Sequence, residues 1–133
     1  MKLWFVPGAL LILLACRDPD SYQPFDPTKS NPPVPPVLVH PANGWMSDDY
    51  AYPQNVSFTW QAVPGAQSYE MQVNDDSLFP ATRPFWRVYQ TSVVYSFQTC
   101  GVRYWRVRAV SNNWNNYTDW SSTFHFALPN PAR

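Results

Sequence analysis

Hydrophobic and polar residues alternate most clearly along residues 102–110. One set of alternate positions is apolar and consists of Trp105, Val107 and Ala109. The set between them consists of Tyr104, Arg106 and Arg108. Because successive side chains of a β-strand point to opposite faces of its sheet, this pattern predicts a strand. We expect its apolar face to fill a core, and its other face to show an aromatic residue and two arginines to water.

Six further segments carry a similar pattern between turn residues. The predicted strands cover residues 37–42, 55–62, 67–74, 87–90, 91–97 and 122–128. The residues expected to point inward are Val56, Phe58, Trp60, Tyr69, Met71, Val73, Val93, Tyr95, Phe97, Phe124 and Phe126. Glu70 and His125 fall out of phase with them and are expected to face water. With residues 45–54 and 111–119 as loops, seven short strands at this spacing predict an all-β sandwich.

The composition fits one all-β domain. The chain has 133 residues, 15 prolines and a formal net charge of zero. Prolines disfavour long helices, and a neutral chain lacks the positive charge that binding to nucleic acid requires. We therefore expect no nucleic acid partner. Of the two cysteines, Cys100 is expected to be a small, partly buried residue near a turn.

The first sixteen residues have the pattern of a secretory signal. Lys2 precedes a mostly apolar run over residues 3–15, which is short for a membrane span. The run ends in Leu13-Leu14-Ala15-Cys16, which resembles the lipobox of bacterial lipoproteins. The resemblance implies that residues 1–15 are removed as a signal peptide and that Cys16 carries acyl chains, which anchor the protein to a membrane. A plain signal peptide cleaved nearby is the alternative.

The residues after Cys16 bear on where the protein is located. Arg17 stands where the related inner-membrane lipoproteins carry aspartate, which implies the bacterial outer membrane. Asp18 and Asp20 form a short acidic patch similar to the surface-export signal of Bacteroidota lipoproteins, which favours the cell surface over the periplasm. Residues 16–36 are rich in proline, and we interpret them as the lipidated cysteine and a semi-rigid linker.

Several motifs after the linker together resemble a bacterial fibronectin type III domain. They are Val56-x-Phe58-x-Trp60, Pro64-Gly65-Ala66, Tyr69-x-Met71-x-Val73, Trp105-Arg106-Val107-Arg108-Ala109 and Trp120-Ser121. We assign this domain to residues 37–129. The resemblance implies a seven-stranded immunoglobulin-like sandwich in which the strand of Trp105 lies between those of Tyr69 and Phe124. A tyrosine usually staples one corner of the family's fold; here Arg103 stands at that place, so either Tyr104 remakes the corner or the staple is missing.

The polar residues form no pattern of a catalytic or metal site. The two histidines, His40 and His125, have no nucleophile or carboxylate partner that the sequence places beside them. The acidic pairs 48–49 and 75–76 have the oxygen ligands that Ca²⁺ prefers, but solvated acids in turns explain them better. We therefore expect no enzyme activity, no cofactor and no metal.

Trp120-Ser121 resembles a degenerate Trp-Ser-x-Trp-Ser motif, in which tryptophan stacks with arginines of the neighbouring strand. Arg106 and Arg108 are the available arginines, so we predict a structural cation–π ladder of these three residues rather than a ligand site. Glu70 is expected to lie on a strand beside that of Arg106 and Arg108. Removing Trp120 should cost more stability than removing Glu70, because the loss of stacking adds to the loss of buried area.

Two clusters of loop aromatics are candidate binding residues, since sandwich domains bind through their loops. One cluster is Trp114 and Tyr117, and the other is Trp45, Tyr50 and Tyr52. The other interpretation is that these rings cover the ends of the sandwich. Two functions follow: a non-catalytic, membrane-anchored protein-interaction module serving as accessory subunit of an outer-membrane or cell-surface assembly, or a glycan-binding surface lipoprotein. In the first, we expect the loop of Trp114 to lie on the membrane side and contact an outer-membrane protein, with the loop of Trp45 at the other end.

Overall fold

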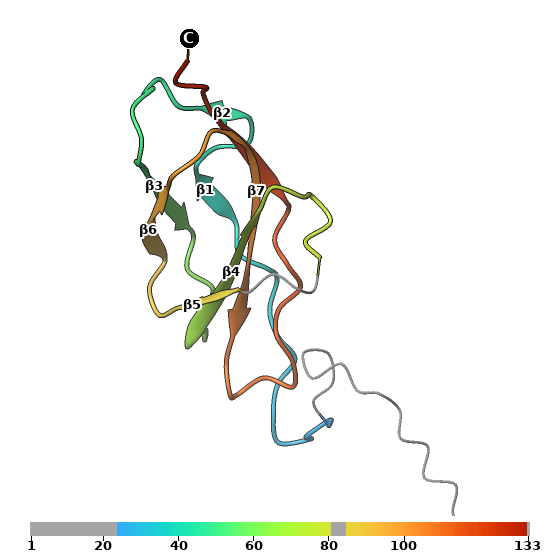
Figure 1. Cartoon of the computed structure of the whole chain (residues 1–133). Coiled ribbons are helices and arrows are strands. Elements are labelled where there is room, and N and C mark those ends of the chain that lie inside the picture. Colours follow the sequence, from blue (N-terminus) through green and yellow to red (C-terminus); the bar gives the residue numbers. More distant parts are fainter. Residues whose placement is uncertain (1–23, 81–84, 133) are drawn as a thin grey trace, which may run out of the picture.

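The computed structural model describes residues 24–80 and 85–132 of the chain (Figure 1). These residues form strands and connecting loops. The strands are β1 (Leu38–His40), β2 (Trp45–Met46), β3 (Gln54–Trp60), β4 (Ser68–Asn74), β5 (Trp86–Val88), β6 (Ser92–Phe97), β7 (Gly101–Val110) and β8 (Phe124–Leu128). They build one sheet in the order β1-β3-β6 and another in the order β2-β8-β7-β4-β5. The predicted sandwich class is confirmed.

Strand β7 is the centre of the larger sheet because its apolar face is fully buried. Trp105, Val107 and Ala109 have no exposed surface, as their alternation predicts. The strand pairs antiparallel with β4 on one side and with β8 on the other, which confirms the predicted position between the strands of Tyr69 and Phe124. This order places the polar face of β7 beside the polar face of β4.

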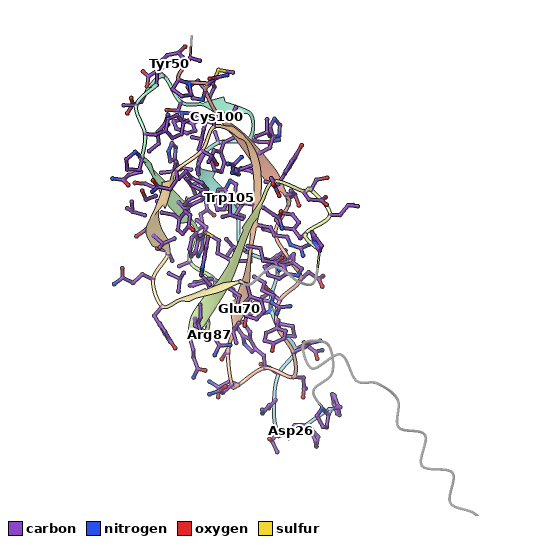
Figure 2. The ribbon with its side chains drawn as sticks, viewed as in Figure 1. Asp26, Tyr50, Glu70, Arg87, Cys100 and Trp105 are labelled. Carbon is purple, nitrogen blue, oxygen red and sulfur yellow. The ribbon has the colours of Figure 1, made fainter. Side chains whose placement is uncertain are left out.

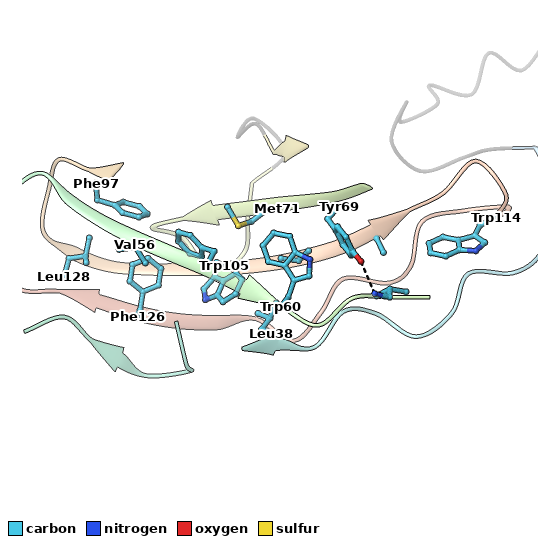
Figure 3. Close-up of a cluster of buried hydrophobic side chains, with 14 residues drawn as sticks. Leu38, Val56, Trp60, Tyr69, Met71, Phe97, Trp105, Trp114, Phe126 and Leu128 are labelled. Carbon is cyan, nitrogen blue, oxygen red and sulfur yellow. Dashed lines mark hydrogen bonds between the residues drawn. The ribbon is translucent and has the colours of Figure 1, made fainter. Parts of the chain in front are cut away.

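Aromatic rings fill the space between the two sheets (Figure 3). Phe58 of β3 meets Trp105 of β7 at a centroid distance of 5.0 Å and Phe126 of β8 at 5.7 Å, both edge to face. Trp60 meets Tyr69 in the same way, and the Tyr69 hydroxyl accepts a hydrogen bond from the Val63 amide. Edge-to-face pairs are the favourable arrangement of such rings. They tie β3 to the strands of the other sheet.

The segment after β1 differs from its prediction. Residues 45–54, predicted as a loop, contain the two-residue strand β2, which runs parallel to β8. The amides of Gly44 and Ser47 donate to the carbonyls of His125 and Ala127, and these bonds hold the segment against the sheet edge. A strand of two residues is too short to show an alternation of polar and apolar side chains, so the sequence does not predict it.

Polar residues on the outer faces of β4 and β7 are more buried than predicted. Glu70, expected to face water, is 1% exposed, and Gln72 and Arg108 are also buried. They point away from the core as the alternation requires. Glu70 and Gln72 bond to the arginines of β7, and rings from residues outside the two strands cover those arginines. A two-residue period assigns a side chain to a face of the sheet and does not tell whether that face is covered.

The turn from β6 to β7 settles the question of the missing tyrosine staple. Arg103 donates to the Thr99 carbonyl and hydroxyl and to the Cys100 carbonyl, so it closes its own corner. Tyr104 instead lies beside His125 on the solvent side. Cys100 is exposed, and the prediction that it is partly buried is wrong, because the turn holds it outside the sandwich.

Candidate functional site

Two arginines of β7 lie in a stack of aromatic rings on the outer face of the larger sheet. The guanidinium carbon of Arg106 lies 4.3 Å from the ring centres of both Phe79 and Trp120. That of Arg108 lies 4.5 Å from Trp120 and 4.0 Å from Tyr117. Rings and guanidinium groups therefore alternate along the strand. We call these five residues the cation–π ladder; it contains the Trp120, Arg106 and Arg108 of the sequence hypothesis, and adds Phe79 and Tyr117.

Beneath the ladder the arginines are held by polar groups of β4. Glu70 accepts from Arg108 Nη2 at 2.6 Å and from Arg87 Nη2 at 3.0 Å, one arginine on each neighbouring strand. Gln72 accepts from Arg106 Nε at 2.9 Å. The hydrogen bond to Glu70 raises the pKa of Arg87, whereas burial and the nearby Arg108 lower the pKa of Arg106. Figure 2 shows Glu70 and Arg87 side by side.

The segment carrying Trp120 is fixed to β7 by two hydroxyl groups. The Thr118 and Ser121 hydroxyl oxygens accept from the amides of Ala109 and Val107, at 2.9 and 3.0 Å. In return the amides of Thr118 and Ser121 donate to the carbonyls of the same two β7 residues. The hydroxyl groups of Thr118 and Ser121 thus take part in hydrogen bonds that a neighbouring strand would otherwise make with β7. The cation–π ladder is therefore a structural cover of the sheet, and its arginines already have bonding partners.

Trp114 does not offer the binding surface expected of it. Its side chain belongs to the core and is 6% exposed. A Cβ atom on Gly65 would lie 3.4 Å from the Trp114 ring, so the ring packs against the turn between β3 and β4. The expectation that Trp114 contacts a partner is therefore corrected: the ring closes the end of the sandwich, which was the other interpretation of these aromatics. Tyr117 belongs to the ladder.

The backbone around Trp114 is also occupied, because residues 26–30 pair with it. Ser30 donates to the Asn113 carbonyl, and Asn115 donates to the Ser30 carbonyl. The Asn115 side chain accepts from the Asp26 amide at 2.7 Å and donates to the Lys29 carbonyl at 3.2 Å. We call residues 26–30 the docked segment. In Figure 1 this segment (blue) and the loop after β7 lie at the lower end of the domain.

Asp26 shapes the docked segment into a turn. Its carboxylate accepts from the Thr28 amide at 2.9 Å and from the Thr28 hydroxyl at 2.6 Å. These bonds lower the pKa of Asp26 below its usual range, the hydroxyl contributing most. The ionised carboxylate is therefore the form that the turn favours.

The aromatics of the first loop lie at the opposite end of the domain, near the C-terminus (Figure 1). Trp45 is half-buried between His40 and Phe126. The Tyr52 hydroxyl donates to the Pro129 carbonyl at 2.6 Å, and burial raises its pKa. Tyr50 is 51% exposed and is the ring of this group that is available to a ligand.

A groove of about 390 Å³ opens on the side of the sandwich where neither sheet continues. Its apolar wall includes Val73, Trp86, Tyr95 and Phe97, and Arg103 and Asp75 lie among its polar residues. Trp86 of β5 and Tyr95 of β6 stack with ring centres 4.4 Å apart, so their contact joins the two sheets beside the groove. The sequence pattern does not reveal this groove, because its strand residues come from four different strands.

Cys16, the proposed site of lipidation, and the signal sequence lie outside the described residues. Among residues 24–80 and 85–132, no three histidine, cysteine or acidic side chains gather where they could hold a metal ion. In the same ranges no helix has the length and apolar character needed to cross a membrane.

Comparison with known proteins shows similarity at the level of the fold. No family model matches the chain, and no curated protein matches its sequence. A Fn3-like protein from Clostridium thermocellum is 23% identical and covers 75% of this chain and 96% of its own, with a TM-score of 0.47. The fibronectin type III domain of human fibronectin type III domain containing protein 3 is 13% identical over 77% of this chain and 90% of its own, with a TM-score of 0.49.

Proposed function

We propose that the protein is a lipid-anchored, non-catalytic protein-interaction module, an accessory subunit of an assembly at the bacterial outer membrane. Acyl chains on Cys16 hold it in the membrane, and its partner is an outer-membrane protein. Residues 13–16 support the anchor, Arg17 supports the outer membrane, and the acidic residues at 18 and 20 support surface exposure. A fibronectin type III-like sandwich is commonly an interaction module, which supports the rest of the proposal.

The observation that carries this proposal is the docked segment. Because Asp26 to Ser30 are bound to the loop of Trp114, the part of the chain that contains Cys16 is joined to the domain at this end. Only the residues before the docked segment then separate the lipid from this end of the sandwich. The end with Trp114 lies on the membrane side, and Tyr50 lies at the far end. A partner reaches the flanks and the far end of the domain more readily than the Trp114 loop.

Glycan binding is the second candidate. The exposed ring of Tyr50 supports it, because an aromatic face can stack on a sugar. Trp45 and Tyr52 are engaged by the domain itself, so this cluster offers one free ring. We therefore place protein binding first. Binding of soluble polysaccharides by the purified full chain, lost on Tyr50→Ala, would reverse that order.

The anchor is tested by the intact mass of the protein extracted from membranes. We expect Cys16 to be the N-terminal residue and to carry acyl chains, and Cys16→Ser to release the protein from the membrane fraction. Cys100→Ser is the matched control, since this exposed thiol lies in the folded domain, and it should stay with the membrane. A wild-type protein found soluble and unacylated contradicts the anchor.

The partner is tested by site-specific photo-crosslinking in intact cells, with the crosslinker at Tyr50 or at Asn112. Asn112 is an exposed position at the membrane-side end, beside the docked segment. We expect an integral outer-membrane protein to be captured from the domain's exposed surface. If neither position, nor any on the flanks, yields a membrane protein, the accessory-subunit proposal fails.

A further inference from the structure

One edge of the sandwich is unlike the other three. Each sheet has two edge strands: β1 and β6 in the smaller sheet, β2 and β5 in the larger. Three of them are short, with two or three residues each, whereas β6 has six. All six pair with β3 in a continuous register without a bulge. Within the described residues, no strand pairs with the other side of β6.

The backbone of β6 offers hydrogen-bonding groups on this open side. The Trp60 amide donates to the Thr91 carbonyl, so Thr91 exchanges bonds with β3. In an antiparallel pair, residues alternate between facing the partner and facing away. The N–H and C=O groups of Ser92, Val94 and Ser96 therefore point to the open edge, while those of Val93 and Tyr95 bond to β3.

This edge also lacks the usual protection. Natural edge strands are blocked against further pairing by charged side chains, proline, bulges or short length. The β6 sequence, residues 92–97, contains no charged residue and no proline. The side chain of Val94 is exposed at its centre. A long, regular, uncharged edge is a template for one more strand.

The groove described above runs beside the same edge. Tyr95 and Phe97 of β6 form part of its wall, together with Val73 and Trp86 from the other sheet. An added strand alternates its side chains, so every second one would face inward to this apolar wall. Strand addition combines backbone bonds for affinity with such pockets for specificity.

We propose that β6 is a strand-addition site, which binds an extended, uncharged segment of a partner protein with apolar side chains toward the groove. The strand itself presents no charge, which favours an uncharged occupant along β6; the charged residues of the groove, Asp75 and Arg103, come from outside this strand. A second copy of this chain fits less well: antiparallel pairing of two β6 strands turns one domain end for end. In each chain the docked segment holds the same end of the domain toward the membrane. Two chains anchored in one membrane therefore cannot adopt that arrangement. The proposal rests on the proposed interaction function and names the site that serves it.

The test uses the full chain in detergent micelles and an end-blocked octapeptide of alternating threonine and valine. Residue-resolved amide exchange is measured with and without the peptide. We expect exchange to slow at least tenfold at Ser92, Val94 and Ser96, and to stay unchanged at Val93 and Tyr95. The same peptide with every third residue replaced by proline should have no effect, because it cannot form a strand.

Variants separate the edge from the rest of the sheet. Val94→Pro removes an N–H that β3 does not use, and Val94→Lys adds the charge that protects natural edges. Both should weaken peptide binding at least tenfold. Ser57→Lys is the matched control, since Ser57 faces Val94 on the central strand, and its binding should stay within twofold of wild type.

Three results would overturn the proposal: no peptide binding, slowed exchange elsewhere than at the three amides, or equal binding by Val94→Lys. A concentration-dependent dimer of the full chain that Val94→Lys abolishes would show that a second copy occupies the edge, and would contradict the proposal that a different protein does. These outcomes are independent of the mass of Cys16, so failure of strand addition and failure of the anchor are distinguishable.

Discussion

Glu70 and Arg108 face each other across β4 and β7, with Glu70 Oε2 2.6 Å from Arg108 Nη2. Both side chains are on the outer face of the sheet and yet are buried, since the rings of Trp120 and Tyr117 cover the arginine. An ion pair in this position differs from one in water, because removal of one partner leaves the other charged and without compensation. This ion pair therefore determines how much stability is lost when residues of the outer face are substituted.

Removing Glu70 should cost more stability than removing Trp120, the reverse of the order that an exposed Glu70 would give. Glu70→Ala leaves Arg108 buried without its carboxylate, which costs about 3–5 kcal/mol. Trp120→Ala loses two cation–π contacts of about 0.5–1 kcal/mol each, besides the area of a half-buried ring. Denaturant unfolding of both variants measures the order. Asp119→Ala, at an exposed neighbouring position, is the control, and a larger loss for Trp120→Ala contradicts the buried ion pair.

The hydroxyls of Thr118 and Ser121 should each contribute measurably to stability. Ser121→Ala leaves the buried Val107 amide without its acceptor, and an unsatisfied buried donor costs about 1–3 kcal/mol. Thr118→Ala should have a similar effect at Ala109. Ser122→Ala is the control, because Ser122 is exposed, and it should change the free energy of unfolding by less than about 0.5 kcal/mol. Equal unfolding curves for Ser121→Ala and Ser122→Ala would show that the hydrogen bond from the Val107 amide to the Ser121 hydroxyl does not stabilise the fold.

Asn115→Ala should release the docked segment while the sandwich stays folded. Two side-chain hydrogen bonds are lost, to the Asp26 amide and the Lys29 carbonyl, at about 0.5–1.5 kcal/mol each. We expect trypsin to cut after Lys29 roughly ten times faster, since about 1.4 kcal/mol changes the open population tenfold. Asn112→Ala, whose exposed side chain lies in the same loop, is the control. An unchanged rate of cleavage in Asn115→Ala means that the segment is held by other contacts.

Docking of residues 26–30 should weaken in acid. The pKa of Asp26 is lowered in the folded chain, so its contribution is complete above the pKa of an unfolded aspartate. That contribution is lost as the pH falls through the lower, folded value. The amide signal of Asn115, which donates to the Ser30 carbonyl, should shift in this acid range. Asp26→Asn should remove this step from the titration; a variant with the same pH profile as wild type shows that another group causes it.

The sequence by itself determined seven of the eight described strands, all but β2, and the side of the sheet on which their alternating side chains lie. Period-two alternation at Val56, Phe58 and Trp60, and again at Trp105, Val107 and Ala109, allows one burial pattern only, because a shift by one residue would turn every apolar side chain to water. The same alternation, with the arginines of β7 and Trp120, was enough to suggest the stack of rings and guanidinium groups.

Only the tertiary structure decided what covers each face and edge. Phe79 and Tyr117 cover the arginines from loops whose sequence has no period, which is why the burial of Glu70 was not predicted. The docked segment binds mainly through backbone groups and one asparagine. Backbone hydrogen bonds do not depend on side-chain type, so the proline-rich composition of this part of the chain did not predict them. Whether a strand lies at an edge is a property of sheet order, which pairs residues distant in the chain. The open edge of β6 therefore became visible only in the folded sandwich.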